Sequence, residues 1–167
     1  MNYLTEQLSS NHPKSKFDCG VDLLNTYLHK QAKQDIRRKL SACFVMFDKE
    51  AELLKGYYTL SNSSIPQDMI PNSISKKLPN SYDSIPTTLL GRLAVDTKYK
   101  GQGVGEALLV DALKRSYYTS VAVGSFAVIV DPFDEGAIRF YEKYGFIQLP
   151  DSGKMFIPMK TVQSLFN

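Results

Sequence analysis

The sequence predicts one α/β domain over residues 1–167, with helices on both faces of a mixed sheet. Its apolar segments alternate between the short period of strands and the longer period of helices, which is typical of this class. A chain of 167 residues is long enough for one hydrophobic core. The composition agrees, because 43% hydrophobic and 22% charged residues are ordinary for a globular protein.

The first part of the chain carries one expected helix and two expected strands. The helix runs from Val21 to about Arg38, because apolar residues recur at helical spacing from Leu23 to Leu28. The apolar run Ala42–Phe47 and the segment Leu53–Ser61 are predicted as strands joined by a hairpin connection.

Between Asn62 and Thr87 the composition shifts to serine, asparagine and proline. These residues interrupt the periodicity, so a long connecting loop is predicted, with one short helix around Ser75–Leu78. Loops of this length in compact domains commonly form binding walls or lids.

The remaining part of the chain alternates strands with helices. A helix is expected from Val104 because the apolar residues that follow keep helical spacing. Gly145 is suited to end the next helix as its C-cap. The expected elements are a strand Thr88–Val95, a helix from Val104 to about Tyr118, a strand Ser125–Val130, a helix Asp134–Tyr144, and strands Phe146–Leu149 and Met155–Met159.

Composition argues against several classes of function. Cys19 and Cys43 are too few for a disulfide framework and lack metal-type spacing, so small buried thiols are predicted. No metal site is expected, because His12 and His29 stand apart from other ligand residues. No apolar run approaches the roughly 20 residues of a membrane helix, and the first residues lack a signal-peptide pattern. A cytoplasmic protein is therefore expected, and its net charge of +3 is well below that of a dedicated nucleic-acid binder.

Three glycines at alternate positions, Gly101, Gly103 and Gly105, lie where a strand passes into a helix. Backbone amides free of side chains at a helix N-terminus favour an anion such as a pyrophosphate. A dinucleotide fingerprint is incomplete because Glu106 follows Gly105, and no Gly-Lys-Ser/Thr triplet completes a Walker A loop. A tight turn without a ligand stays open at this point.

The run Lys100-Gly101-Gln102-Gly103-Val104-Gly105 resembles the acetyl-CoA motif of the GNAT superfamily, with Lys100 in place of the usual Arg or Gln. Ala137-Ile138-Arg139-Phe140-Tyr141-Glu142-Lys143-Tyr144-Gly145-Phe146 resembles the second signature of the same superfamily. This resemblance implies the GNAT fold, a mixed and mostly antiparallel sheet, and acyl transfer from acetyl-CoA to an amine. No metal is implied.

The resemblance also implies roles for particular residues. Backbone amides from Gln102 to Ala107 would hold the pyrophosphate, and the strand edge Leu93–Val95 would pair with the pantetheine arm. The Val95 amide would face the thioester oxygen as an oxyanion donor. The cosubstrate-binding residues so implied are Leu93, Ala94, Val95, Lys100, Gly101, Gln102, Gly103, Val104, Gly105, Glu106 and Ala107.

Tyr141 is the candidate general acid, because the thiolate leaving group must receive a proton and a phenol can supply it. The alternative is a packed aromatic side chain, since Phe140, Tyr144 and Phe146 are close in sequence. Tyr144 is the second candidate and is expected in the core.

Five further segments are similar to the GNAT toxins of bacterial toxin–antitoxin systems. That resemblance implies acetylation of the α-amino group of aminoacyl-tRNA, a small ribbon-helix-helix antitoxin and a homodimer. An α-amine, with a pKa of about 7.7–8.0, is partly neutral without a strong base, unlike a lysine amine at about 10.4. The segments are Phe17–Gly20, Leu24–Leu28, Gly56–Ser61, Gly91–Asp96 and Asp111–Arg115, with Val130-Asp131-Pro132 as a departure from the toxin pattern.

Basic residues are the candidates for contact with RNA phosphates, although a solvated helix face is the alternative for each of them. Arg92 is different, because a charge inside an apolar strand needs a partner or a substrate. Asp96 is the acid closest to the proposed thioester strand, and a role in the turn is expected for it. The candidates are Lys30, Lys33, Arg37, Arg38, Lys39 and Arg92, with Lys114 and Arg115 as additions.

Two other functions remain open. The chain could be a GNAT enzyme that acetylates a small molecule or a protein amine, or a module that binds acyl-CoA without turnover. The acyl chain is taken as acetyl.

Overall fold

The computed structural model describes residues 2–166, which divide into two compact units. Unit 1 contains the residues up to Ser61 together with Leu90–Arg115, and unit 2 contains Asn62–Leu89 together with the residues from Ser116 onward. Strands β3 (Leu53–Pro66) and β4 (Ser84–Val95) and helix α4 (Val104–Ala122) each contribute residues to both units.

The described residues form a seven-stranded sheet in the order β1-β2-β3-β4-β5-β7-β6. The pairs β1–β2, β2–β3, β5–β7 and β6–β7 are antiparallel, whereas β4 and β5 are parallel. The predicted mixed, mostly antiparallel sheet is therefore confirmed. The strands besides β3 and β4 are β1 (Glu6–Gln7), β2 (Ala42–Asp48), β5 (Ala127–Val130), β6 (Ile147–Gln148) and β7 (Met155–Pro158).

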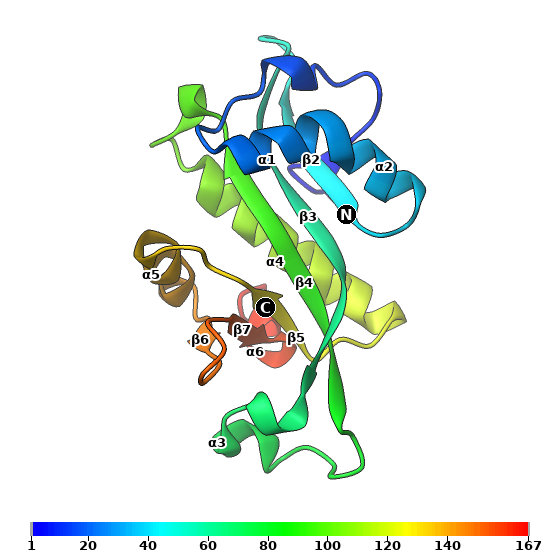
Figure 1. Cartoon of the computed structure of the whole chain (residues 1–167), viewed down its shortest axis with the longest axis vertical. Coiled ribbons are helices and arrows are strands. Elements are labelled where there is room, and N and C mark those ends of the chain that lie inside the picture. Colours follow the sequence, from blue (N-terminus) through cyan, green and yellow to red (C-terminus); the bar gives the residue numbers. More distant parts are fainter. Residues whose placement is uncertain (1, 167) are drawn as a thin grey trace. The chain divides into compact units, whose positions relative to one another are not determined.

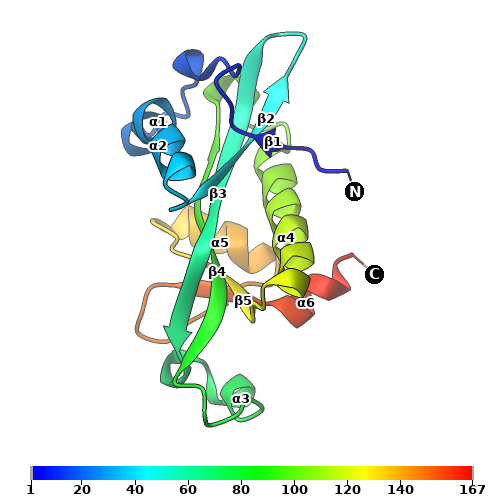
Figure 2. The same cartoon turned by 90° about the vertical axis from the view of Figure 1, so that its right-hand side faces the viewer.

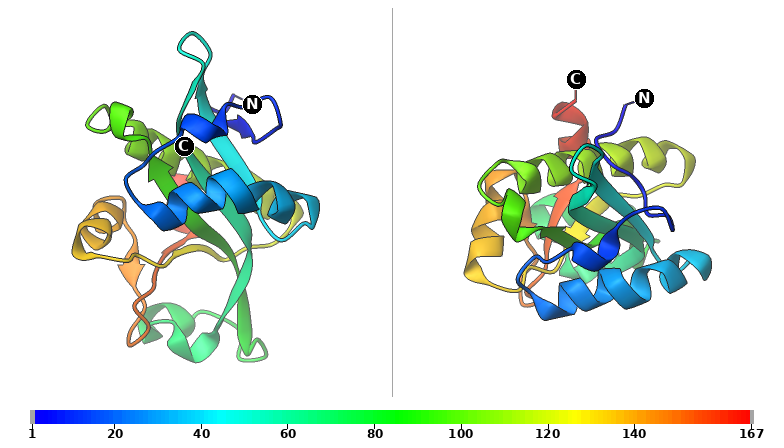
Figure 3. Two further views of the ribbon diagram at one scale, coloured as in Figure 1. Left: turned by 45° about the horizontal axis from the view of Figure 1, so that its top comes forward. Right: turned by 90° about the horizontal axis from the view of Figure 1, so that it is seen from above.

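Unit 1 has helices on both faces of its strands. Helices α1 (Asp22–Thr26) and α2 (Ala32–Arg37) lie across β2 and β3, and the first part of α4 lies on the opposite face (Figures 2 and 3). Buried side chains from the turn Tyr27–Gln31, from α2 and from the strands form one hydrophobic cluster, which includes Leu28, Cys43, Tyr57 and Ala94. Burial of these apolar side chains is the main stabilisation of the unit.

The predicted helix over Val21–Arg38 is present, but it is not regular. A π-helical turn, Tyr27–Gln31, separates α1 from α2. Sequence periodicity does not reveal such a turn, because the wider turn shifts the apolar stripe by only one position.

The predicted long loop over Asn62–Thr87 is wrong at both ends, whereas the middle is a connection with one short helix, as expected. Strand β3 continues to Pro66, β4 begins at Ser84, and between them lie a 3-10 turn, Gln67–Met69, and the short helix α3 (Asn72–Ser75) (Figure 1). The strand ends are polar because alternate residues such as Asn62 and Ser64 are exposed, while Ile65 is buried. The short helix begins three residues earlier than expected, directly after Pro71.

The remaining elements of unit 2 follow the prediction with one omission. Helix α5 (Glu135–Lys143) is capped by the Asp134 side chain, which accepts a hydrogen bond from the Ala137 N–H at 2.7 Å. Gly145 has a φ of +95° just after this helix, as a C-cap requires. Helix α6 (Met159–Ser164) was not predicted, although its residues Met159 and Val162 are buried. No helix among the described residues has the length and apolar character needed to span a membrane.

Candidate active site

The glycine turn before α4 depends on glycine for its backbone conformation. Gly101 and Gly103 have φ angles of +78° and +79°. A residue with a Cβ atom adopts such a positive φ only at a cost in free energy. A Cβ atom at either position would meet no atom of the described chain within 4 Å. The space next to both glycines is therefore open to a ligand.

The N-terminus of α4 presents backbone amides at this turn. The first N–H groups of an α-helix have no partner within the helix, and the helix dipole favours an anion beside them. The Ala107 N–H, expected among the binding amides, is instead donated to the Gly103 carbonyl oxygen at 3.0 Å. The series of backbone amides that we assign to the phosphate site therefore ends before Ala107.

Gly56 lets β3 approach the strand that precedes the turn. A Cβ atom there would lie 2.6 Å from the Ala94 carbonyl oxygen and 2.7 Å from Leu108 Cδ1. Both distances are shorter than real Cβ contacts, so only glycine fits without movement of the neighbours. Gly56 is thus a residue that sets the position of Leu93–Val95, the proposed thioester strand.

Asp96 joins this strand to the turn and to the loop Phe17–Gly20. Its buried carboxylate accepts hydrogen bonds from the Lys98 N–H at 2.8 Å and from the Asp18 N–H at 3.0 Å. The Thr97 N–H in turn donates to the Asp18 carbonyl oxygen at 2.9 Å. The structure therefore places Asp96 in the turn, as expected, with its carboxylate engaged by backbone groups.

Hydrogen bonds and burial shift the pKa values of Asp18 and of the two cysteines. The Gly20 N–H, followed by the Asn25 amide, lowers the pKa of Asp18 because both donate to its carboxylate. Burial raises the pKa of Cys19 and raises that of Cys43 to about 12. Both cysteines are free and buried, which confirms the prediction of small buried thiols.

Lys100 lies beside the turn with its ammonium group bound to protein. Its Nζ donates to the Cys19 carbonyl oxygen at 2.9 Å. Lys100, the cation in the first position of the motif, is therefore hydrogen-bonded to the Phe17–Gly20 loop. Its charge lies at the glycine turn in unit 1.

Tyr141 belongs to α5 in unit 2 and lies among aromatic side chains. Its ring centroid is 5.3 Å from that of Phe140 and 5.1 Å from that of Phe146. Burial raises the pKa of its phenol to about 12, so the proton is retained at neutral pH. In the described part of the chain no group forms a hydrogen bond with this hydroxyl, which leaves it available to a ligand.

The basic residues separate into two groups. Those on and after the helix α1–α2 are exposed, whereas Arg115 is enclosed by protein. Its guanidinium stacks 3.8 Å over the Tyr3 ring and 3.9 Å over the Phe44 ring, and it donates to the Tyr58 hydroxyl at 3.0 Å. Arg115 is thus a structural residue, which corrects its place among the RNA candidates, and Lys114 donates to the Asn2 carbonyl oxygen at 3.0 Å. The exposed group is Lys30, Lys33, Arg37, Arg38 and Lys39.

Arg92 contacts an aromatic ring and one hydroxyl group. Its guanidinium carbon lies 3.5 Å from the centre of the Tyr27 ring, and Nη1 is 3.5 Å from the Thr59 hydroxyl. Tyr27 was not predicted as a site residue. A signal for it existed only in its place within the segment Leu24–Leu28 that resembles the toxins.

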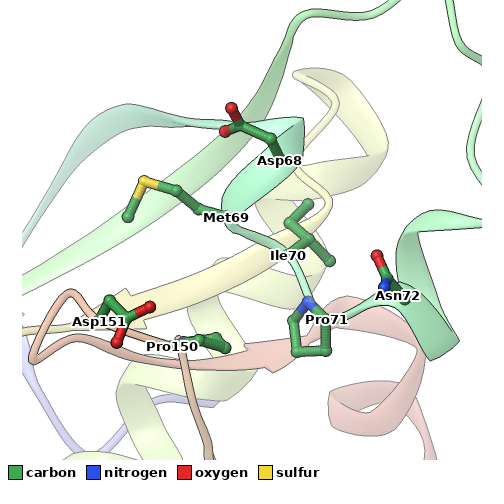
Figure 4. A pocket seen from close by; sticks show the side chains of 7 residues that line it. All are labelled: Asp68, Met69, Ile70, Pro71, Asn72, Pro150 and Asp151. Carbon is green, nitrogen blue, oxygen red and sulfur yellow. The ribbon is translucent and has the colours of Figure 1, made fainter.

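Two cavities in unit 2 contain none of the predicted site residues. The first, of about 500 Å³, lies between the segment Asp68–Asn72 and Pro150–Asp151 (Figure 4). The second, of about 620 Å³, lies between Ile74–Leu78 and the helix α6. Among residues 2–166 there is no group of three or more His, Cys, Asp and Glu side chains suited to a metal ion.

Comparison with known proteins places this geometry in a family. A tRNA-acetylating toxin of Mycobacterium tuberculosis is 30% identical over 160 residues, which cover 95% of this chain and 93% of the toxin. The structure of AtaT complexed with acetyl-methionyl-tRNAfMet matches with a TM-score of 0.90 and 32% identity, over 99% of this chain and 100% of that one. A mutant of AtaT bound to acetyl-CoA and to the C-terminus of the antitoxin AtaR matches with a TM-score of 0.82 and 29% identity, over 98% and 97%.

A family model described as the acetyltransferase (GNAT) domain matches residues 41–148, which include the glycine turn, the proposed thioester strand and Tyr141. The chain therefore belongs to the GNAT acetyltransferases.

Proposed function

We propose that this protein transfers an acetyl group from acetyl-CoA to the α-amino group of aminoacyl-tRNA. The observation that supports the proposal is the open glycine turn with its backbone amides at the start of α4. The exposed basic residues between Lys30 and Lys39 lie in the same unit. One feature suits a pyrophosphate and the other suits RNA phosphates. The tRNA-acetylating toxin and the tRNA-bound AtaT structure support the acceptor.

The reaction that we propose needs few groups from the protein. The neutral amine attacks the thioester carbonyl carbon, and the Val95 N–H stabilises the negative oxygen that forms. The C–S bond then breaks, Tyr141 gives its proton to the departing sulfur, and the acetylated nitrogen releases a proton. The products are the N-acetylated aminoacyl end and free CoA, so no further reactant is needed.

The acid–base arrangement favours an acceptor that is already neutral. The Asp96 carboxylate, the acid nearest to the proposed thioester strand, is buried and bound by two backbone N–H groups. It is therefore poorly placed to remove a proton from a charged amine. An α-amine, with its pKa of about 7.7–8.0, loses its proton to water at neutral pH far more readily than a lysine side chain.

We further propose that residues 1–167 act as one catalytic domain in the cytoplasm, as a homodimer whose activity is controlled by a ribbon-helix-helix antitoxin. The AtaT structure with the C-terminus of the antitoxin AtaR supports the existence of such a partner.

The test is transfer of labelled acetyl groups from acetyl-CoA to purified tRNA, charged in one sample and deacylated in the other. The proposal expects acid-precipitable label only with the charged tRNA, and its loss when the aminoacyl ester is hydrolysed by mild base. Label that appears on neither tRNA, with acetyl-CoA still bound by the protein, would reject the acceptor and leave small-molecule and protein amines.

A further inference from the structure

Two arginines of unit 1 stack on aromatic rings, and they differ in how their hydrogen-bond donors are used. Arg115 donates to the Tyr58 hydroxyl at 3.0 Å and to the Thr5 hydroxyl at 3.1 Å, and it lies 3.9 Å from the buried Asp111 carboxylate. Its charge and its donors are therefore satisfied within the protein.

Arg92 has no such set of partners. It is half-buried, and its one hydrogen bond, to the Thr59 hydroxyl, is long at 3.5 Å. No carboxylate in the described part of the chain lies within 4.0 Å of its guanidinium. A guanidinium carries five N–H donors, and leaving a half-buried cation without an anion is costly. The site therefore has the character of an anion subsite.

Tyr27 fixes the plane of the Arg92 guanidinium. The ring lies 3.5 Å from the guanidinium carbon, and its hydroxyl donates to the Asp35 carboxylate at 2.9 Å. The π-helical turn Tyr27–Gln31 begins at this residue, and such turns are frequent at functional sites. Stacking covers one face of the guanidinium, and apart from the long contact with Thr59 its donors are available for a planar, two-point contact with phosphate oxygens.

The distance along β4 matches the length of one aminoacyl nucleotide. Arg92 precedes Val95 by three residues, which is about 10 Å in an extended strand. In an aminoacyl adenosine the α-amine and the 5′-phosphate are separated by a chain that spans roughly 10 Å at ordinary bond lengths. A phosphate bound by Arg92 would therefore be within reach of an amine at the Val95 N–H.

We propose that Arg92, held by Tyr27, binds the phosphate on the 5′ side of the terminal adenosine of the acceptor tRNA. This inference rests on the proposed function and names one subsite of it. Arg92 acts as a positioning residue, because it fixes the nucleotide that carries the amine rather than the reacting atoms. The subsite distinguishes an amine attached to a nucleotide from the amine of a free amino acid or a peptide.

Two fragments of one charged tRNA pool test the subsite directly. Ribonuclease A releases aminoacyl adenosine without a 5′-phosphate, and nuclease P1 releases aminoacyl adenosine 5′-phosphate. The wild-type protein is expected to acetylate the phosphorylated fragment with a kcat/KM about 10- to 100-fold higher, the range for a hydrogen bond to a charged group. Arg92→Gln is expected to abolish this preference while the rate on the fragment without phosphate changes little.

Arg92→Lys and Lys49→Gln are the matched variants. Lysine at position 92 keeps the charge but not the planar fork, so the preference for the phosphorylated fragment should be reduced but not lost. Lys49 is exposed, carries the same charge and lies outside the proposed binding residues, so its removal should leave that preference intact. Thermal unfolding of each variant checks that the fold is retained.

The outcomes separate the two proposals. Equal acetylation of both fragments by the wild-type protein would overturn the subsite and leave the acceptor assignment standing. The same conclusion would follow if Arg92→Gln lowered the acetylation rate of both fragments by the same factor. If neither the fragments nor intact charged tRNA were acetylated, the proposed function would fail and the subsite with it.

Discussion

Tyr141 is a phenol that keeps its proton at every pH at which the protein would work. Burial raises its pKa to about 12, and no described group accepts a hydrogen bond from it. Tyr141→Phe should lower kcat by about 100-fold or more, the usual contribution of a general acid. Affinity for acetyl-CoA should not change, because the phenol contributes to proton transfer and not to holding the phosphates. Steady-state rates and calorimetric titration measure the two effects separately.

Tyr144→Phe is the control for this variant, since both tyrosines lie at the same end of α5 and next to Phe140. It should keep activity within a few-fold of the wild type. A large loss with Tyr144→Phe and none with Tyr141→Phe would move the acid to Tyr144.

The roles of residues that belong to a sequence motif could be predicted better than the roles of residues that depend on packing. The glycines of the turn and the turn role of Asp96 could be found, because they follow from backbone geometry and spacing. The structural role of Arg115 could not, because its rings and hydroxyl partners come from Tyr3, Phe44 and Tyr58, all distant in sequence. Charge alone does not show whether an arginine is exposed or enclosed.

The glycine turn is the element on which cosubstrate binding depends. Gly103→Val should weaken acetyl-CoA binding at least about 10-fold, since a β-branched residue at a positive φ costs roughly 1–3 kcal/mol and would re-aim the amides. Its side chain would also occupy the open space beside the amides. Gly124→Val is the matched control, because that glycine also faces open space but lacks a positive φ. Unchanged affinity for acetyl-CoA with Gly103→Val would contradict the phosphate-site assignment.

The approach of β3 to β4 makes a second prediction about elements. Gly56→Ala would place a Cβ atom 2.6 Å from the Ala94 carbonyl oxygen. Relief of this overlap should cost about 1–3 kcal/mol of folding free energy and shift the strand that holds Val95. Thermal unfolding should therefore show a lower Tm, and kcat should fall more than KM rises. A variant with wild-type Tm and kcat would show that the strands can adjust freely.

Element types were predictable where apolar residues repeat with a clear period, as in α4, α5 and the paired strands β2 and β3. The ends of the segment Asn62–Thr87 were misjudged because the polar residues and prolines there lie on exposed strand positions, as Asn62 and Ser64 do in β3 and Pro86 does in β4. Short elements were missed for a different reason. β1 has two residues and α6 has six, too few for a period to be visible.

For the whole molecule, three buried tyrosines and the half-buried Tyr141 predict how stability depends on alkaline pH. The pKa values of Tyr27 and Tyr141 rise from 10.0 to about 12, and those of Tyr57 and Tyr58 are also raised by burial. Below pH 10 all four are protonated in the folded and unfolded chains, so they contribute no pH dependence. Between about pH 10 and 12 the unfolded chain loses its protons first, so stability falls as pH rises.

Each tyrosine that ionises only in the unfolded chain lowers the free energy of unfolding by about 1.4 kcal/mol per pH unit. In thermal unfolding between pH 8 and pH 11.5, the Tm should therefore stay constant up to about pH 10 and decline above it. Tyr141→Phe should make that decline less steep. A Tm that stays constant throughout this range would mean that these phenols are more exposed in solution than in the structure.

Mass spectrometry of bulk charged tRNA after incubation with acetyl-CoA shows whether the protein acetylates aminoacyl-tRNA. Ribonuclease A digestion releases the aminoacyl adenosines, so the mass and fragmentation of each shows whether the α-amino group carries an acetyl group. We expect N-acetylated aminoacyl adenosine with the wild-type protein and about 100-fold less of this product with Tyr141→Phe. Unmodified aminoacyl adenosines from a protein that still binds acetyl-CoA would contradict it.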